Sequence, residues 1–178
     1  MNLLIRPEAL ADRPAVRAII EAAFRPAEPT PRPVVEAVLN DELWLDPDFA
    51  PTLTLVAERD GEVIGQVTSS YGLLIDEQNQ RRVIGVGPVS VLPGRQGAGV
   101  GSALMRALVT VATDAGEPAL VLLGSPDFYG RFGFVPASDL GIHAPDPAWG
   151  KYFQAIRLTP DPSPVGGQYR YAAPFDRL

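Results

Sequence analysis

The sequence contains no cysteine and only one histidine, His143. Without thiols the chain can form neither a disulfide nor a thiolate metal site, and it cannot carry an acyl group as a thioester on a cysteine. One histidine also supplies too few ligands for a histidine-based metal centre. We therefore expect a protein with no bound metal and no covalent cysteine intermediate.

Long hydrophobic runs and an excess of positive charge are also missing. The apolar run at residues 3–5 is short, and no run approaches the roughly 18 residues of a membrane-spanning helix, so we expect a cytoplasmic protein. The 15 Lys and Arg residues against 21 Asp and Glu residues give a formal net charge of −6. This balance disfavours nucleic acid and anionic membranes as principal partners.

The length of 178 residues and the hydrophobic content of 46% predict a single domain over residues 1–178. The spacing of apolar residues and turn formers predicts its elements. These are an edge strand at 3–5, helices at 12–24 (with Asp12 as N-cap) and 34–40, strands at 52–58 and 62–75 joined by Asp60-Gly61, strands at 83–91 and 119–123, a helix at 100–111, a short helix near 128–132, a strand at 152–159, a loop at 161–167 and a short strand or tail at 168–172.

Pro88 lies inside one of these predicted strands. Proline has no N–H to donate to a neighbouring strand, so a central strand that contains it must carry a bulge or lose its pairing on one side. We therefore predict that the sheet is split beside residues 83–91.

The stretch from Gly87 to Arg106 is the most informative part of the chain, because a strand there enters a glycine-rich turn and leaves it as an amphipathic helix. The turn, from Gln96 to Gly101, has a glycine at every second position after Gln96. Without side chains in the way, an anionic group can approach the unpaired N–H groups at the start of a helix. The pattern predicts a binding site for a diphosphate.

Two motifs then resemble a known family. Gln96-x-x-Gly99-x-Gly101 resembles the pyrophosphate-binding motif of the GCN5-related N-acetyltransferase (GNAT) superfamily, and Tyr129 followed by Gly133-Phe134 resembles a second motif of the same superfamily. The run at 124–134 is similar to one in the YhbS-like subgroup, whose acceptors are largely undefined. The resemblance covers residues 3–159 and leaves 160–178 as a C-terminal loop with a short strand or tail.

The resemblance implies an α/β fold: a mixed, mainly antiparallel sheet of roughly six or seven strands, with a splayed parallel pair and helices on both faces. It also implies transfer of the acetyl group of acetyl-CoA to a primary amine by direct attack in a ternary complex. The implied partners are acetyl-CoA and an amine acceptor, and a homodimer is compatible with the pattern.

The same resemblance implies roles for particular residues. The backbone N–H of Val89 would bind the acetyl carbonyl, and Tyr129 would be the general acid, since a phenol with an ordinary pKa of about 10 keeps its proton at neutral pH. The residues implied in coenzyme binding are Val89, Ser90, Val91, Gln96, Gly97, Ala98, Gly99, Val100, Gly101 and Ser102.

A general base is harder to assign, because Gly85 stands where many superfamily members have a glutamate. The alternatives, each of which also fits an ordinary surface residue, are Glu58, Asp76, Glu77, Asp127 and His143. For the acceptor, the resemblance points to the first two helices and the segments beside them. The candidates there are Glu28, Trp44 and Phe49, with Asp41 and Glu42 beside them, although Trp44 and Phe49 also fit a hydrophobic core.

Two rival functions remain open at this point. A nucleotide-binding enzyme also uses a glycine-rich turn between a strand and a helix, but this turn lacks the G-x-G-x-x-G spacing and a terminal Gly-Lys-Ser/Thr. A module that binds acyl-CoA without transferring the acyl group is the second rival. Gly85 in place of an acid favours such a module, whereas Tyr129 favours an enzyme.

Overall fold

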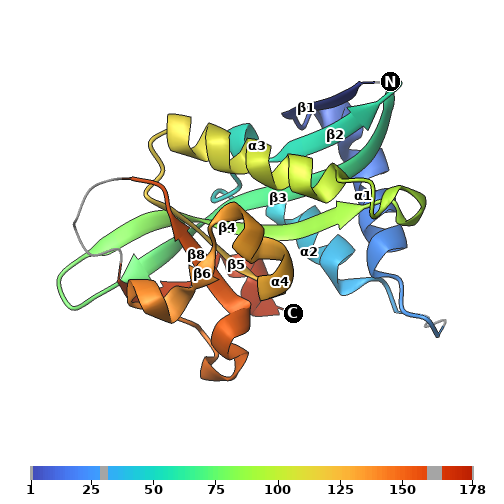
Figure 1. The fold of residues 1–178 in the computed structure, drawn as a ribbon. Coiled ribbons are helices and arrows are strands. Elements are labelled where there is room, and N and C mark those ends of the chain that lie inside the picture. The colour runs from blue at the N-terminus through green and yellow to red at the C-terminus, as the bar shows by residue number, and fades with distance from the viewer. Residues whose placement is uncertain (1, 29–31, 160–165, 178) are drawn as a thin grey trace.

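The computed structural model describes residues 2–28, 32–159 and 166–177, which form a mixed sheet flanked by helices (Figure 1). The main path through the sheet runs β1-β2-β3-β4-β5-β8-β6, and β4 and β5 are its only parallel neighbours within the described residues. Off this path, β9 pairs with the end of β3 and, in parallel, with β7. The strands are β1 (Leu3–Pro7), β2 (Leu55–Arg59), β3 (Glu62–Ile75), β4 (Gln80–Val91), β5 (Ala119–Leu123), β6 (Val135–Pro136), β7 (Ile142–His143), β8 (Phe153–Arg157) and β9 (Gly167–Arg170).

This sheet confirms the mixed, mainly antiparallel arrangement expected from the sequence. The short strands β6 and β7 were not predicted, because segments of two residues carry no periodic pattern. The predicted strand at 168–172 corresponds to β9, while most of the predicted loop at 161–167 lies outside the described residues. In the part of the chain that the structure describes, no helix combines the length and the hydrophobicity needed to span a membrane.

Helices cover both faces of the sheet, as expected (Figure 1). The helices α1 (Arg13–Phe24) and α2 (Val35–Leu43) pack on one face, and α3 (Val100–Asp114) packs on the other. Successive side chains of β2 point to opposite faces of the sheet. Leu55 and Ala57 belong to the core cluster under α3, whereas Val56 packs with Val16 of α1.

The predicted Asp-Gly hairpin is present between β2 and β3, where Asp60 and Gly61 both adopt positive φ. Strand β2 begins three residues later than predicted, at Leu55. The reason is a short 3₁₀ turn, Pro51–Leu53, which begins at a proline and takes up the residues expected to open the strand.

Strand β4 carries the bulge that Pro88 predicts. Val67 of β3 pairs with Val89 of β4, and Ser69 pairs with Val86. Between these two pairs, one residue of β3 lies opposite two residues of β4, Gly87 and Pro88. A count of two residues against one defines a β-bulge, and it accommodates a residue that cannot donate a backbone hydrogen bond.

The split beside β4 is also present. β4 and β5 pair at two positions only, of which Gly85 is the last, so the two parallel strands separate beyond it. On the other side of β4, the N–H of Leu92 donates to the carbonyl of Ile64 in β3 at 2.9 Å. Because backbone groups alternate in direction along a strand, the N–H groups of Val89 and Val91 point away from β3, toward the gap that β5 leaves.

The start of α1 differs from the prediction in one contact. The helix begins directly after Asp12, as expected, but the Asp12 carboxylate makes no N-cap hydrogen bond to it. Instead, both carboxylate oxygens accept from the guanidinium of Arg6, at 2.6 and 2.9 Å, and one also accepts from the N–H of Ala9. A bidentate, charge-assisted pair is stronger than a single cap hydrogen bond, so Asp12 ties β1 to the chain before α1.

Glu8 lies beside this turn with a side chain only 4% exposed. Arg13 Nε stands 3.8 Å from Glu8 Oε1, and Glu8 Oε2 has no hydrogen-bond partner among the described residues. Burial raises the pKa of Glu8 to about 7, against the opposing influence of Trp44 and Arg13. The ionised form of Glu8 is therefore destabilised by the fold.

We predict that Glu8→Gln stabilises the protein at pH 8. The pKa of Glu8 in the folded protein, about 7, lies above the ordinary value of 4.5. The contribution of protonated Glu8 to stability is therefore fully present below pH 4.5 and is lost as the pH rises through about 7. The substitution should raise the free energy of unfolding at pH 8 by about 3 kcal/mol and have much less effect at pH 4.5. Urea unfolding at both values measures this, with exposed Asp139→Asn as control. Equal shifts at the two pH values would contradict the assignment.

Candidate active site

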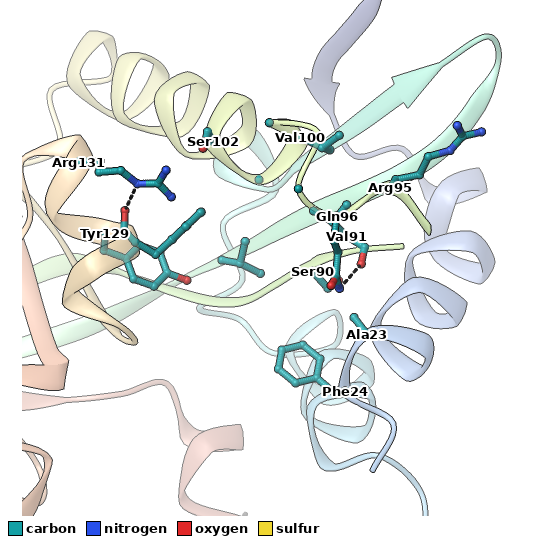
Figure 2. A pocket seen from close by; sticks show the side chains of 15 residues that line it. Ala23, Phe24, Ser90, Val91, Arg95, Gln96, Val100, Ser102, Tyr129 and Arg131 are labelled. Atoms are coloured by element: carbon teal, nitrogen blue, oxygen red, sulfur yellow. Dashed lines mark hydrogen bonds between the residues drawn. The ribbon is translucent and has the colours of Figure 1, made fainter. Parts of the chain in front are cut away.

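The turn that joins β4 to α3 leaves open space beside its backbone. Gly97 and Gly99 have φ angles of 75° and 83°, in the left-handed region that favours glycine. A Cβ atom added to either glycine would meet no other atom within 4 Å. The Gln96 side chain donates from Nε2 to the carbonyl of Val91 at 3.1 Å, which fixes the turn against the end of β4 (Figure 2).

Helix α3 begins immediately after this turn. The N–H of Ala103 donates to the carbonyl of Gly99 at 2.9 Å and closes the first helical turn. The N–H groups of Val100, Gly101 and Ser102 therefore have no acceptor inside the helix. Together with the positive end of the helix dipole, these donors form a site suited to an anion.

A cavity of about 560 Å³ lies over the turn, and we call it the glycine-turn cavity (Figure 2). Residues of β4, the turn, α3, the end of α1 and α4 (Pro126–Tyr129) contribute to its walls. All the residues implied in coenzyme binding line it except Ala98, which lies within the turn. The lining residues are Ala23, Phe24, Val89, Ser90, Val91, Arg95, Gln96, Gly97, Gly99, Val100, Gly101, Ser102, Phe128, Tyr129 and Arg131.

Two arginines in this lining were missed by the sequence analysis. Arg95 and Arg131 lie on opposite sides of the turn in Figure 2. Arg131 is fixed by a hydrogen bond from Nε to the carbonyl of Phe128 at 3.2 Å, and its guanidinium stands 4.7 Å from the Phe128 ring centroid. Arg95 directly precedes Gln96 of the glycine turn, so the sequence could have indicated that it lines the cavity. Arg131 lies far from the turn in sequence, and it lines the cavity only because of how α4 packs. The lining contains two arginines and no carboxylate, so it is net positive, and Arg95 also stands 3.9 Å from Glu62 Oε2 outside the lining.

Tyr129 lies in an aromatic group at the inner end of the cavity. Its ring meets Phe128 edge-on at 4.8 Å between centroids and Phe134 at 6.0 Å. A Cβ atom at Gly124 would overlap the Tyr129 ring, so this glycine makes room for it. Burial raises the pKa of Tyr129 to about 12, and the phenol is therefore protonated throughout the neutral range.

A second cavity, of about 820 Å³, begins on the far side of Tyr129, and we call it the aromatic cavity. It shares Phe24, Val89, Phe128 and Tyr129 with the glycine-turn cavity, so the two meet where β4 and β5 separate. Its other lining residues are Glu36, Leu39, Val86, Gly87, Pro88, Leu123, Gly124, Ser125, Pro145, Trp149, Tyr169, Arg170, Tyr171, Phe175 and Asp176. The sequence analysis singled out none of the aromatic residues contributed by the C-terminal segment.

The structure gives a physical reason for Gly85. Tyr169 of β9 is 1% exposed, and a Cβ atom at either Gly85 or Gly72 would overlap its hydroxyl oxygen. The tyrosine thus fills the space beside Gly85, the position where the superfamily resemblance led us to expect a glutamate. Burial holds the pKa of Tyr169 well above its ordinary value, and its hydroxyl has no hydrogen-bond partner among the described residues. A neutral phenol of this kind cannot replace the missing carboxylate as a base.

The acids considered as bases lie away from both cavities. Glu58 pairs with Arg6 at 2.8 Å, and Asp76 accepts N–H groups in the turn between β3 and β4. Glu77 and Asp127 are exposed and line neither cavity, and His143 lines a separate small hollow. Among the described residues, the carboxylates that do line the two joined cavities are those of Glu36 and Asp176.

The residues considered for acceptor binding are also placed elsewhere. Glu28 is exposed beyond the end of α1, and Phe49 forms an isolated bridge with Ser70 of β3. Trp44 packs at the end of α2, with the Arg13 guanidinium 4.9 Å from its ring centroid. None of the three lines either cavity. Asp41 and Glu42 pair with Arg17 and Arg177 respectively.

Comparison with known proteins agrees with this geometry. Residues 5–137 match the family model described as "Acetyltransferase (GNAT) domain". The chain is 32% identical over 179 residues to the "Uncharacterized N-acetyltransferase YhbS" of Escherichia coli, covering 99% of this chain and 100% of that protein.

Two solved structures are also similar to this chain. The crystal structure of Escherichia coli YhbS in complex with CoA superposes with a TM-score of 0.87 and 29% identity, covering 100% of this chain and 94% of that one. A GNAT family acetyltransferase from Brucella melitensis in complex with acetyl-CoA gives a TM-score of 0.76 and 34% identity, covering 98% and 99%. The expected fold is thereby confirmed. With a family model matched over most of its length and a relative matched along nearly all of it, the chain belongs to the GNAT acetyltransferase family.

Proposed function

We propose that the protein transfers the acetyl group of acetyl-CoA to a primary amine by direct attack in a ternary complex. One observation carries the proposal: the start of α3 and the unpaired edge of β4 line one cavity, and that cavity shares Val89 and Tyr129 with a second one. A coenzyme in the first cavity and an amine in the second would meet at this junction. The relatives crystallised with CoA and acetyl-CoA support the identity of the coenzyme.

The coenzyme would be held mainly by backbone groups. Its pyrophosphate would lie on the glycine turn and the N–H groups of Val100, Gly101 and Ser102, each such contact contributing on the order of 0.3–1 kcal/mol when exposed. Arg95 and Arg131 add positive charge on either side. The pantetheine arm would follow β4, where Val89 and Val91 have no strand partner on that side, and would pair with them as an added strand does.

The chemistry at the junction follows from the same groups. The N–H of Val89 would donate to the acetyl carbonyl oxygen, which becomes negatively charged when the amine attacks. A C–N bond forms, the C–S bond breaks, and the sulfur leaves beside Tyr129. Because the pKa of Tyr129 is about 12, above the roughly 8.5 of a thiol, it stabilises the leaving sulfur chiefly as a hydrogen-bond donor. The amine would give its proton to solvent water in the aromatic cavity, and the departing thiolate would take up a proton from solvent.

A second candidate function is an acyl-CoA-binding module that transfers nothing. Gly85, with Tyr169 packed against it, favours this candidate, because the chain lacks the glutamate that the superfamily resemblance leads one to expect at this position. The two functions differ in one measurement, the release of CoA thiol from acetyl-CoA with a broad panel of amines. Steady release with any amine supports the enzyme, and coenzyme binding without release across the panel supports the module.

We predict that Gly99→Val weakens CoA binding at least about tenfold, because the side chain enters the space reserved for phosphate and strains a backbone with φ of 83°. Gly116→Val is a matched control, since Gly116 has φ of 76°, open space around its Cβ position and no place in the cavity lining. Both variants should lose stability, and calorimetry should find weaker CoA binding for Gly99→Val alone. Equal CoA affinity in the two variants would contradict the site.

We also predict that Tyr129→Phe lowers kcat at least about tenfold while leaving the Kd for CoA nearly unchanged, because the hydroxyl acts on the leaving sulfur. The aromatic packing with Phe128 and Phe134 is retained in this variant. Thiol release measures kcat and calorimetry measures Kd. A turnover equal to that of the natural protein would remove Tyr129 from the mechanism.

A further inference from the structure

The aromatic cavity is walled by side chains that fix one another. Trp149, Tyr169, Tyr171 and Phe175, which we call the aromatic wall, come from the C-terminal part of the chain. Tyr171 stacks on Phe175 with 4.4 Å between ring centroids and meets Tyr169 edge-on at 4.7 Å and Trp149 at 6.2 Å. Rings packed in this way form a preformed apolar surface with little freedom to rearrange.

The C-terminal segment also closes one side of the cavity. Phe175 packs with Leu39 and Leu43 of α2, and Arg177 Nε donates to Glu42 of the same helix at 2.7 Å. The cavity is therefore bounded on this side by the chain's own tail. Its volume of about 820 Å³ lies within the usual range of roughly 300–1,000 Å³ for small-molecule pockets. This shape suits a compact molecule better than an extended polypeptide.

The charged residues of the lining favour a cation. Glu36, in the first turn of α2, is half-buried, and Asp176 is exposed on the tail segment. Arg170 also lines the cavity. The lining therefore contains two carboxylates and one guanidinium, and its net charge is negative. The glycine-turn cavity, which has arginines and no carboxylate, has the opposite sign. An anionic coenzyme and a cationic acceptor would thus be directed to different ends of the same joined space.

We propose that the aromatic cavity binds the acceptor and selects a compact primary amine with an apolar, ring-bearing body. This inference rests on the proposed function, because the cavity reaches the thioester only at Val89 and Tyr129. The ring of the acceptor packs on the aromatic wall, and Glu36 contacts its ammonium before the amine loses a proton and attacks. An ammonium close to aromatic faces gains additional electrostatic stabilisation. A lysine on a protein surface has no ring to pack on this wall and would gain less from it.

The two tryptophans of the chain provide a binding signal that is independent of turnover. Trp149 lines the aromatic cavity, whereas Trp44 packs between α1 and α2 outside it. In a Trp44→Phe background, fluorescence therefore reports Trp149 alone. Ligands are added to the CoA-loaded protein, so that the acceptor site is tested without catalysis.

The probe is 2-phenylethylamine, compared with ethylamine, which keeps the charge, and 2-phenylethanol, which keeps the ring. We expect 2-phenylethylamine to bind at least about tenfold more tightly than ethylamine, because the ring buries apolar surface. It should bind at least about fivefold more tightly than 2-phenylethanol, because the ammonium is attracted to the carboxylates. Equal affinity for 2-phenylethylamine and ethylamine, or no change in Trp149 fluorescence, would overturn the proposal.

Substitution of Glu36 tests the charge separately from the ring. Glu36→Gln should weaken 2-phenylethylamine binding about fivefold and leave 2-phenylethanol unchanged, because it removes charge and keeps the shape. Asp114→Asn removes the same charge at the exposed far end of α3 and should change neither. Equal weakening of both ligands by Glu36→Gln, or an equal effect of Asp114→Asn, would contradict a direct contact with Glu36.

Activity assays separate failure of this inference from failure of the proposed function. If 2-phenylethylamine has a higher kcat/KM than ethylamine and a lysine-containing peptide, the inference is supported. If the peptide or ethylamine is acetylated at least as well, the acceptor class is wrong and the acetyltransferase function stands. If acetyl-CoA does not bind at all, both proposals fall together.

Discussion

The separation of β4 from β5 is the constraint on which the rest of this structure depends. Pro88 cannot donate to a neighbouring strand, and the bulge at Gly87 and Pro88 allows β4 to continue along β3 while its other edge is left unpaired. An unpaired strand edge in the interior would be costly unless another group supplied the missing hydrogen bonds. A coenzyme with an amide-bearing arm would supply them under the proposed function, so we propose that the split is a binding element.

The second half of the site depends on aromatic packing rather than on the backbone. Tyr169 reaches into the sheet only because Gly72 and Gly85 have no side chains, and its neighbours Tyr171 and Phe175 form a wall behind the bulge. The C-terminal strand β9 therefore does two things at once: it extends the sheet along β3, and it lines the aromatic cavity that we propose for the acceptor. The same packing leaves no space for a side chain at Gly85.

The fold and the glycine turn between β4 and α3 could be predicted from sequence because their signals are local. The glycine turn, the periodic helix after it and Pro88 each indicate a structure within a few residues, and the turn, the helix and the bulge are found where they were expected. The acceptor end could not be predicted in this way. Glu36 and Trp149 are more than a hundred residues apart in the chain. Both line the aromatic cavity, because the C-terminal segment packs on α2. Trp44 was an attractive candidate from its residue type; in the structure its ring centroid lies 4.9 Å from the Arg13 guanidinium, and it lines neither cavity.

The central claim is that exposed backbone N–H groups of β4, the glycine turn and α3 hold the coenzyme. Titration of the ¹⁵N-labelled protein with CoA, followed by the amide resonances, tests it most directly. The account predicts that the largest shifts fall on Val89, Val91 and residues 97–102. Saturable binding with the largest shifts elsewhere, for example around His143, or no shifts at all, would contradict it.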